Sequence, residues 1–113
     1  MKPGKRKGNK LPPFVAVSRE TMRSKEWREG LTSSEKILYL HLKYKYVGDN
    51  NGELCLHYSE LKGLMSKGTA WRAFKGLEEK GWIEKTKIGG LFRFINHYKL
   101  TGKYDNALVK YNF

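Results

Sequence analysis

The chain has a single cysteine and no long apolar run. Cys55 is alone among 113 residues, so no internal disulfide can form, and no Cys/His spacing matches a zinc site. It lies in the apolar run Leu54–Leu56, where a free thiol is usually a small buried hydrophobe. No stretch approaches the roughly 18 apolar residues of a membrane span. The run Leu11–Val17 is too short and too rich in proline for a secretory signal, so we expect a cytoplasmic protein.

Motifs for catalysis are also missing. His41, His57 and His97 are scattered along the sequence, and no carboxylate pair, phosphate loop or nucleophile motif accompanies them. A lone histidine is more often a structural or surface group than a catalytic one. We therefore predict that the chain is not an enzyme, and that it takes no small-molecule substrate, cofactor or metal.

Acidic residues are scarce relative to basic ones. Asp and Glu number 11 against 23 Lys and Arg, which gives a formal net charge of +12. Such an excess favours an anionic partner, either nucleic acid or an acidic membrane surface. The alternative is a soluble basic protein with no such partner. A chain of 113 residues is long enough for one domain with one core.

The sequence begins with a basic stretch. Its first ten residues hold five cations, two glycines and one proline, and no apolar residue follows the initial Met. Such a segment cannot bury enough surface to offset its ordering entropy. We therefore predict a disordered basic arm at residues 1–12, which either solubilises the protein or contacts a nucleic acid.

Residues 13–30 are predicted to form an N-terminal extension, first extended and then helical. Ser18 can cap a short helix, because its hydroxyl can accept a hydrogen bond from the first turn. Met22 and Trp27 are the expected core contacts of this helix, and Gly30 is its expected end.

Residues 33–47 carry two competing patterns. Apolar and polar residues alternate from Leu40 to Tyr46, as they do in a half-buried strand. Thr32 and Glu35, however, have the spacing of a capping box, and the run is long for a strand. We therefore predict a helix.

This predicted helix is apolar on two sides. By the 3.6-residue period, one face holds Ile37, Leu40, Tyr44 and Val47, and a nearly opposite face holds Leu38, Leu42 and Tyr46. A helix that is apolar on two sides is buried on two sides. One face should meet the rest of the domain. The other should be covered by residues 14–27 or by a second subunit, which makes a homodimer a candidate assembly.

The segment that follows is predicted to hold a turn at 48–52, a short strand at 53–56 and a short helix beginning at Tyr58 or Ser59. The side chains expected to point inward from this short helix are Leu61, Leu64 and Met65. A tight turn at Ser66 then leads into the next helix.

That next helix is predicted from its period, with Gly81 as its C-cap. Its apolar side carries Ala70, Ala73, Phe74 and Leu77, and its other side carries Gly68, Trp71, Arg72, Lys75 and Glu79. Gly68 and Gly76 each cost about 1 kcal/mol relative to Ala in a helix interior. Both are expected near the exposed side, where they either allow a close approach or are merely tolerated.

Two strand-like runs, 82–88 and 91–100, are joined by Gly89 and Gly90, which predicts a hairpin. On the second run, alternation places Phe92, Phe94, Tyr98 and Leu100 on one side and Arg93, His97 and Lys99 on the other. Residues 102–113 are expected to form a weakly ordered or partner-dependent tail.

The order of these elements resembles a winged helix-turn-helix domain over residues 31–101. In that family a Ser or Thr opens the recognition helix, apolar residues follow at the fourth and eighth positions, and a closing run starts the wing. Those places are held here by Ser66, Ala70, Phe74 and the run Leu77–Ile83. The resemblance implies an α+β, mainly helical fold. It consists of a three-helix core with a two- to three-stranded wing sheet, preceded here by an N-terminal helical extension.

The chain is also similar to small winged-helix proteins of phages, plasmids and other mobile elements. The matching stretches are FVAVSRETMRSKEWREGLTSSEKILYLHL at 14–42 and NNGELCLHYSEL at 50–61. Some of those proteins regulate replication or transcription. The resemblance therefore implies a sequence-specific double-stranded DNA-binding protein that regulates a mobile element and joins the nucleoid when bound to DNA.

The resemblance further implies a recognition helix at 66–80 and a basic wing at 82–100. A recognition helix reads base edges in the major groove with side chains near its N-terminus. Arg72 can bond a guanine or clamp a phosphate, Lys75 is expected at a phosphate, and wing cations release counterions. The candidate DNA-binding residues are Ser66, Lys67, Gly68, Thr69, Trp71, Arg72 and Lys75 on the helix, and Lys85, Lys87 and Arg93 on the wing.

Trp71 has two interpretations. It can stack on a sugar or a thymine methyl group, or it can fold over the first helix at the rim of the core. We favour the rim, because Trp71 lies at the edge of the exposed side. Two other functions remain open, namely a protein-interaction module that uses Trp71 with the aromatic C-terminus, and RNA binding.

Overall fold

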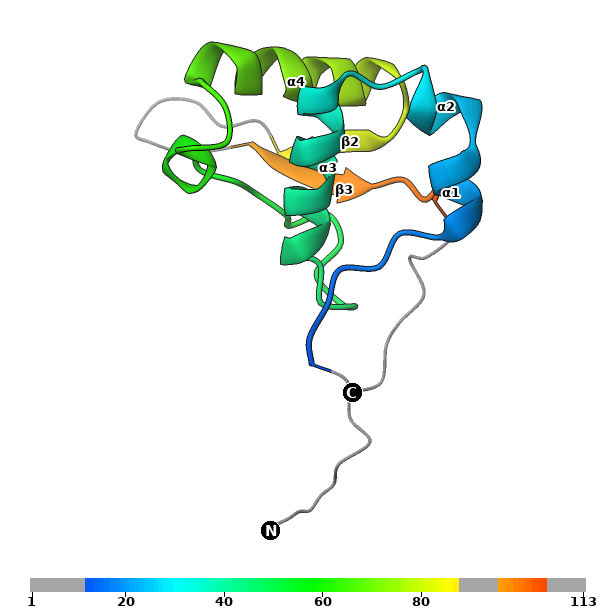
Figure 1. The fold of residues 1–113 in the computed structure, drawn as a ribbon. Coiled ribbons are helices and arrows are strands. Elements are labelled where there is room, and N and C mark those ends of the chain that lie inside the picture. Colours follow the sequence, from blue (N-terminus) through cyan, green and yellow to red (C-terminus); the bar gives the residue numbers. More distant parts are fainter. Residues whose placement is uncertain (1–11, 88–95, 106–113) are drawn as a thin grey trace, which may run out of the picture.

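Helices come first along the chain, and an antiparallel pair of strands follows (Figure 1). The computed structural model describes residues 12–87 and 96–105. No helix within these residues has the length and apolar character that crossing a membrane requires. The predicted α+β class is confirmed at this level. The elements are α1 (Arg19–Arg23), α2 (Lys25–Arg28), α3 (Ser33–Lys45), the 3-10 helix η1 (Tyr58–Leu61), α4 (Lys67–Glu79), β2 (Ile83–Lys87) and β3 (His97–Leu100).

Several predictions concern residues outside the described ranges. They are the basic arm up to residue 11, the tail from residue 106 onward, and the hairpin tip with Gly89, Gly90, Phe92, Arg93 and Phe94. Arg93 therefore stays a candidate that rests on the sequence.

The N-terminal extension folds as two short helices instead of one. Ser18 caps α1 as predicted, since its Oγ accepts a hydrogen bond from the Thr21 backbone N–H at 3.1 Å. Ser24 ends α1 and caps α2 in the same way, through the backbone N–H of Trp27 at 3.2 Å. The cap at Ser24 therefore divides the single helix that was predicted here into α1 and α2.

The inward side of α1 is polar. Trp27 is buried as predicted, but Met22 is 54% exposed, so the predicted core contact of Met22 is wrong. Thr21 takes the inward position, and its Oγ1 donates a hydrogen bond to the carbonyl of Tyr104 at 2.7 Å. Because α1 meets a backbone carbonyl there, a hydroxyl fits the site better than a thioether.

Helix α3 begins with the predicted capping box. Thr32 Oγ1 accepts from the Glu35 backbone N–H at 3.1 Å, and Glu35 Oε1 accepts from the Thr32 backbone N–H at 2.8 Å. This reciprocal pair satisfies the first turn and excludes the strand alternative. The side chains that α3 buries toward the domain include Leu38, Tyr39 and Leu42.

The second apolar face of α3 is not covered in the single chain. Ile37, Leu40 and Tyr44 are 36%, 36% and 66% exposed, and Val47, which follows the end of α3 at Lys45, is 73% exposed. The prediction that α3 is buried on two sides is therefore wrong for one copy of the chain. The described part of residues 14–27 leaves this face open.

The chain after the turn runs along the second edge of β3. Leu54 forms an antiparallel bridge with Tyr98, with N–H donors in both directions at 3.1 and 2.7 Å. The Asn51 side-chain amide bonds the carbonyl and the N–H of Leu100 at 2.9 and 2.8 Å. The Asn51 side chain thus occupies the backbone groups of Leu100 that a neighbouring strand would bond. The strand predicted at 53–56 is therefore a single bridge at Leu54.

The short helix predicted from Tyr58 is the 3-10 helix η1. Leu61 is buried and Met65 packs against the core, as expected. Leu64 is 43% exposed, so its predicted inward position is wrong. Gly63 has a φ of +88°, which redirects the chain after η1, so the helical period does not extend to Leu64.

Helix α4 follows the predicted period from its Ser66 cap to Gly81, whose φ is +85°. Its buried residues are Ala70, Ala73, Phe74, Gly76 and Leu77. The sequence predicted Gly76 near the exposed side of α4, and this prediction is wrong because Gly76 is buried. A Cβ atom there would lie 1.7 Å from Oε2 of Glu35, so Gly76 is where a carboxylate of α3 approaches the backbone of α4.

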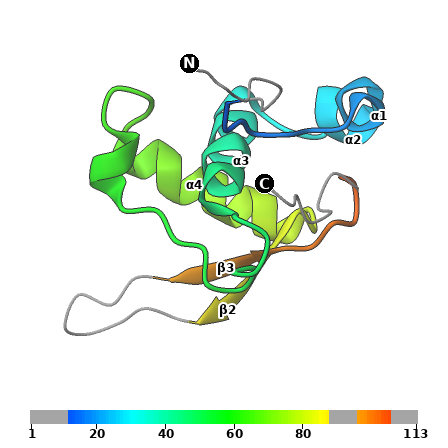
Figure 2. The ribbon, with the colours of Figure 1, turned by 90° about the horizontal axis from the view of Figure 1, so that it is seen from below.

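Strands β2 and β3 are antiparallel, with Ile83 opposite Leu100 and Lys85 opposite Tyr98. The register shifts between Lys85 and Lys87. Figure 2 shows α3 and α4 crossing each other on the same side of this sheet. The buried side chains of Ile83, Tyr98 and Leu100 belong to the core between the two layers.

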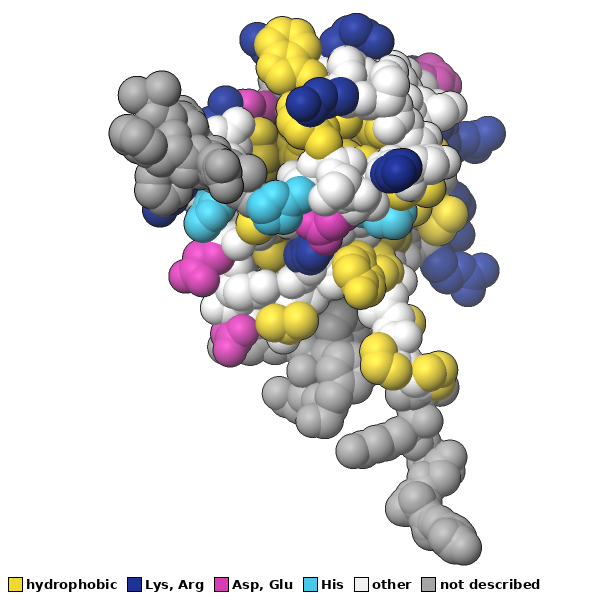
Figure 3. All heavy atoms as spheres, turned by 90° about the vertical axis from the view of Figure 1, so that its left-hand side faces the viewer, with side chains coloured by type: hydrophobic (Ala, Val, Ile, Leu, Met, Phe, Trp, Pro, Cys, Tyr) yellow, Lys and Arg dark blue, Asp and Glu magenta, His cyan; other side chains and the backbone are white. Residues whose placement is uncertain are grey.

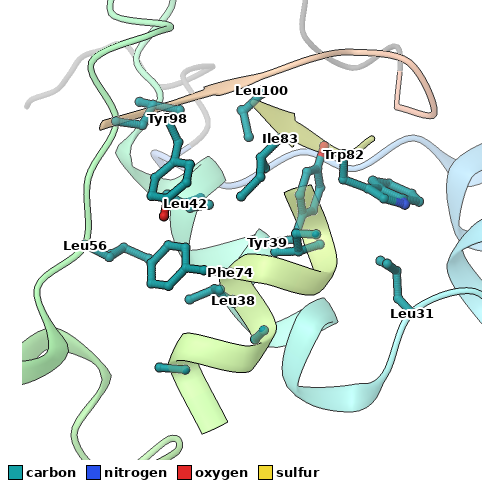
Figure 4. Packing of buried hydrophobic residues seen from close by; sticks show 14 of the residues in the cluster. Leu31, Leu38, Tyr39, Leu42, Leu56, Phe74, Trp82, Ile83, Tyr98 and Leu100 are labelled. Atoms are coloured by element: carbon teal, nitrogen blue, oxygen red, sulfur yellow. The ribbon is translucent and has the colours of Figure 1, made fainter. Parts of the chain in front are cut away.

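Aromatic rings hold the helices against the hairpin (Figure 4). The ring of Tyr39 lies 5.2 Å from that of Trp82, which in turn lies 5.0 Å from the ring of Tyr104. Phe74 stacks on Tyr98 with 4.9 Å between centroids and 11° between planes. These contacts fix which side of α4 faces inward, and so fix the opposite side as the exposed one.

Residues 102–105, predicted as the start of a weakly ordered tail, instead belong to the fold. Asp105 is 1% exposed and forms an ion pair with Lys43, whose side chain is 3% exposed. Tyr39 Oη donates to Asp105 Oδ2 at 2.6 Å, and the Ser18 backbone N–H donates to Oδ1 at 3.4 Å. Burial, and then the hydrogen bond to Asp105, raise the pKa of Tyr39 above its ordinary value.

Candidate nucleic-acid interface

The first turn of α4 is ordered by two hydroxyl groups. Ser66 Oγ accepts from the Thr69 backbone N–H at 3.2 Å and lies 2.9 Å from Thr69 Oγ1. Arg72 reaches back toward the same turn, since its NH2 group donates to Thr69 Oγ1 at 3.4 Å. The side chains of Ser66, Thr69 and Arg72 therefore form one polar group at the N-terminal half of the exposed side.

The N-terminus of α4 carries no acidic residue. The helices α1, α2 and α3 each have a Glu in the first turn, namely Glu20, Glu26 and Glu35, and α4 has none. A helix N-terminus carries a partial positive charge, which an acidic side chain would offset. The positive end of α4 is therefore left for another anion, and Lys67 adds a full charge to it.

A row of three residues runs along the exposed side of α4. Lys67, Trp71 and Lys75 are spaced by four residues, so they are neighbours on the helix surface. Trp71 is 55% exposed, and the Nζ of Lys75 lies 5.0 Å from the centroid of its ring. Trp71 is not among the side chains that pack against the core, so the favoured rim interpretation is wrong. Ala70 and Phe74 already fill the inward side of this turn.

Tyr58 extends this row from a different element. The Nζ of Lys67 lies 5.3 Å above the ring of Tyr58, which is 39% exposed and belongs to η1. Sequence reasoning used Tyr58 only as a helix start and missed it as a site residue. No periodic spacing relates positions 58 and 67, because the turn at residues 62–66 brings the two side chains together.

The cations of the exposed side lack acidic partners. Lys67, Arg72 and Lys75 form no ion pair with any described residue. Three acids of neighbouring elements are paired with other lysines, in the pairs Glu35–Lys80, Glu60–Lys45 and Glu78–Lys85. Figure 3 looks at the left-hand side of Figure 1, and Lys and Arg side chains flank an exposed hydrophobic side chain along its upper edge, where α4 lies.

The predicted wing cations have different surroundings. Lys85 is half-buried, and its Nζ lies 3.9 Å from Oε1 of Glu78 on α4. Its charge is therefore partly offset, which weakens its case as a DNA contact. Lys87 is exposed at the end of β2, beyond the register shift. The structure thus brings the seven candidates of residues 66–75 together on one helix and sets Lys85 apart from them.

Comparisons with known proteins add nothing to this site. The chain matches no protein-family model, no curated protein and no solved structure. In the described part of the chain, no three His, Cys, Asp or Glu side chains gather where they could hold a metal ion.

Proposed function

We propose that this protein has a winged helix-turn-helix fold and binds double-stranded DNA through α4. Its role would be to regulate transcription or replication of a mobile element. The observation that carries the proposal is the exposed side of α4, where three cations form no ion pair with a described residue and the first turn of the helix holds no acid. Such a surface attracts the phosphate backbone and releases counterions on binding.

The shape of α4 suits the major groove. An α-helix fits that groove and contacts base edges through residues near its N-terminus. Ser66, Lys67 and Thr69 lie there and are exposed or half-buried. Arg72 lies one turn further and can bond a guanine or a phosphate, and Lys75 is placed for a phosphate.

The hairpin would act as the wing. Strands β2 and β3 follow α4 directly, and the Leu54 bridge adds a third strand position on the far side of β3. Helices α3, η1 and α4 would supply the three-helix core of the same fold. Lys87 is exposed at the end of β2 and would be the wing cation that contacts the DNA backbone.

We expect the protein to bind a fluorescent random-sequence duplex at low salt, with an affinity that falls steeply as salt rises. Arg72→Ala should weaken this binding about fivefold or more, because it removes a contact to phosphate or base. Fluorescence anisotropy at several salt concentrations measures both effects. Arg28→Ala is the matched control, since it removes the same charge from an exposed position on α2.

The outcomes separate the candidate functions. Equal losses for Arg28→Ala and Arg72→Ala would mean that net charge, not α4, drives binding. If no duplex is bound even at low salt, the DNA proposal is wrong and a protein partner becomes the first alternative. Preferential displacement of the duplex by a single-stranded RNA competitor would move the function to RNA.

A homodimer stays a prediction. The face that a second copy would cover is the exposed one of Ile37, Leu40, Tyr44 and Val47. Analytical ultracentrifugation should then give a dimer that Val47→Glu, at the most exposed of these positions, converts to monomer. A wild-type chain that sediments as a monomer at high concentration would contradict it.

A further inference from the structure

Aromatic rings and cations alternate along the α4–η1 surface. In order, this row contains Tyr58, Lys67, Trp71 and Lys75, and each ring has a lysine within 5.3 Å of its centroid. Both rings are substantially exposed, at 39% and 55%. Such a row leaves large apolar ring surfaces exposed to water. We therefore expect a partner that packs against the faces of the rings.

Paired bases cannot stack face to face on these rings. In a continuous duplex each base is stacked between its neighbours, so a protein reaches only base edges and backbone in the grooves. An unpaired base has a free face that stacks on an aromatic side chain. Lysines spaced between the rings would meet the phosphates that link successive bases.

The existing cation–π contacts do not block such stacking. An exposed lysine over a ring is held more weakly than a base stacked on the same ring. Neither Lys67 nor Lys75 has an acidic partner in the described residues, so each ammonium group can swing from its ring to a phosphate. One strand can thereby replace both contacts with stronger ones.

We propose that the row Tyr58–Lys67–Trp71–Lys75 binds DNA with unpaired bases, so that the protein prefers a duplex with a melted segment over a continuous one. Trp71 and Tyr58 stack on unpaired bases, and the two lysines bind the adjoining phosphates. The inference rests on the proposed function, because the same α4 surface must meet DNA.

A second aromatic–cation pair in the chain provides a matched control. Tyr44 is 66% exposed and has the Nζ of Lys45 at 6.0 Å from its ring centroid. Lys45, however, forms an ion pair with Glu60, and that contact raises the pKa of Lys45. Its charge is already offset, so this pair on α3 should not take part in binding DNA.

The test compares two DNAs of the same length and flanking sequence, a continuous duplex and one with a central bubble of unpaired bases. Anisotropy titrations should give about tenfold tighter binding to the bubble. In Trp71→Ala the ratio of the two affinities should fall close to 1, and in Tyr58→Ala it should fall part of the way. Trp71→Phe keeps a ring and should keep most of the preference, whereas Tyr44→Ala should leave it unchanged.

Tryptophan emission gives an independent readout. Trp27 and Trp82 are only 8% and 3% exposed, so Trp71 is the indole that acrylamide in solution can reach. Binding of the bubble DNA should quench part of the Trp71 emission. The Trp71 emission that remains should be less sensitive to acrylamide, because the stacked base covers the ring. Binding of the continuous duplex should do so less.

The failures are distinguishable. Salt-dependent binding of both DNAs with equal affinity would overturn this inference and leave the proposed duplex binding intact. A bubble preference that persists in Trp71→Ala would also overturn it, since stacking would then occur elsewhere. Binding of the bubble alone would support the stacking row and overturn duplex recognition, and binding of neither DNA would overturn both proposals.

Discussion

Replacing Asp105 by Ala should lower the free energy of unfolding by about 3–5 kcal/mol, because it leaves a buried charge without its partner. The Lys43 side chain is 3% exposed, and its ammonium group pairs with Asp105. Tyr39 Oη also donates to this carboxylate, at 2.6 Å. Urea denaturation of wild type and Asp105→Ala, followed by circular dichroism, measures the loss.

Two further variants show whether the buried pair is the cause. Asp49→Ala removes an aspartate from an exposed turn and should change stability by less than about 0.5 kcal/mol. Replacing both partners, Lys43→Met with Asp105→Leu, should recover part of the loss, because no unpaired charge then remains buried while the Tyr39 hydroxyl still lacks its acceptor. A cost of Asp105→Ala no larger than that of Asp49→Ala would contradict the burial of Asp105.

Gly76→Ala should destabilise the protein by about 1–3 kcal/mol, although Ala is the better helix former by about 1 kcal/mol. The new Cβ would lie 1.7 Å from Oε2 of Glu35, so the carboxylate has to move. Moving it breaks its bonds to the Thr32 N–H at 2.8 Å and to the Lys80 Nζ at 2.6 Å. Thermal or urea unfolding measures the change.

The sign of the effect should depend on Glu35. In a Glu35→Ala background the space opposite Gly76 is open, and Gly76→Ala should then be neutral or stabilising by up to about 1 kcal/mol. Gly68→Ala is the control within the same helix, because a Cβ there meets only an Arg72 nitrogen at 3.7 Å. If Gly76→Ala stabilises the wild-type protein as Gly68→Ala does, the close approach of Glu35 is not real.

Three helix starts were predictable because capping is local. Ser18, Ser66 and the Thr32–Glu35 pair each bond a group three residues away, so the sequence alone contains both partners. Gly81 ends α4 for an equally local reason, its positive φ. The three starts matched the predictions, whereas the C-cap of α4 is Lys80 and the predicted Gly81 is the residue after it.

The period of α4 was also sufficient to define its exposed side. Ala70, Phe74 and Leu77 are buried, and Trp71, Arg72 and Lys75 are exposed, as the 3.6-residue repeat predicts. Most of the candidate site was therefore available from the sequence. The same reasoning failed for α3, because a period shows that a face is apolar but not that anything covers it.

Contacts between distant residues were decided by the tertiary structure alone. Asp105 meets Lys43 across 62 positions, and Lys80 meets Glu35 across 45. No local pattern relates such residues, since their distance depends on how α3, α4 and the hairpin pack. Thus the sequence by itself determined where α1, α3 and α4 begin and which side of α4 is cationic. Only packing decided that Asp105 is buried, that Gly76 faces a carboxylate and that Tyr58 joins the row on α4, because each of these requires two elements to meet in space.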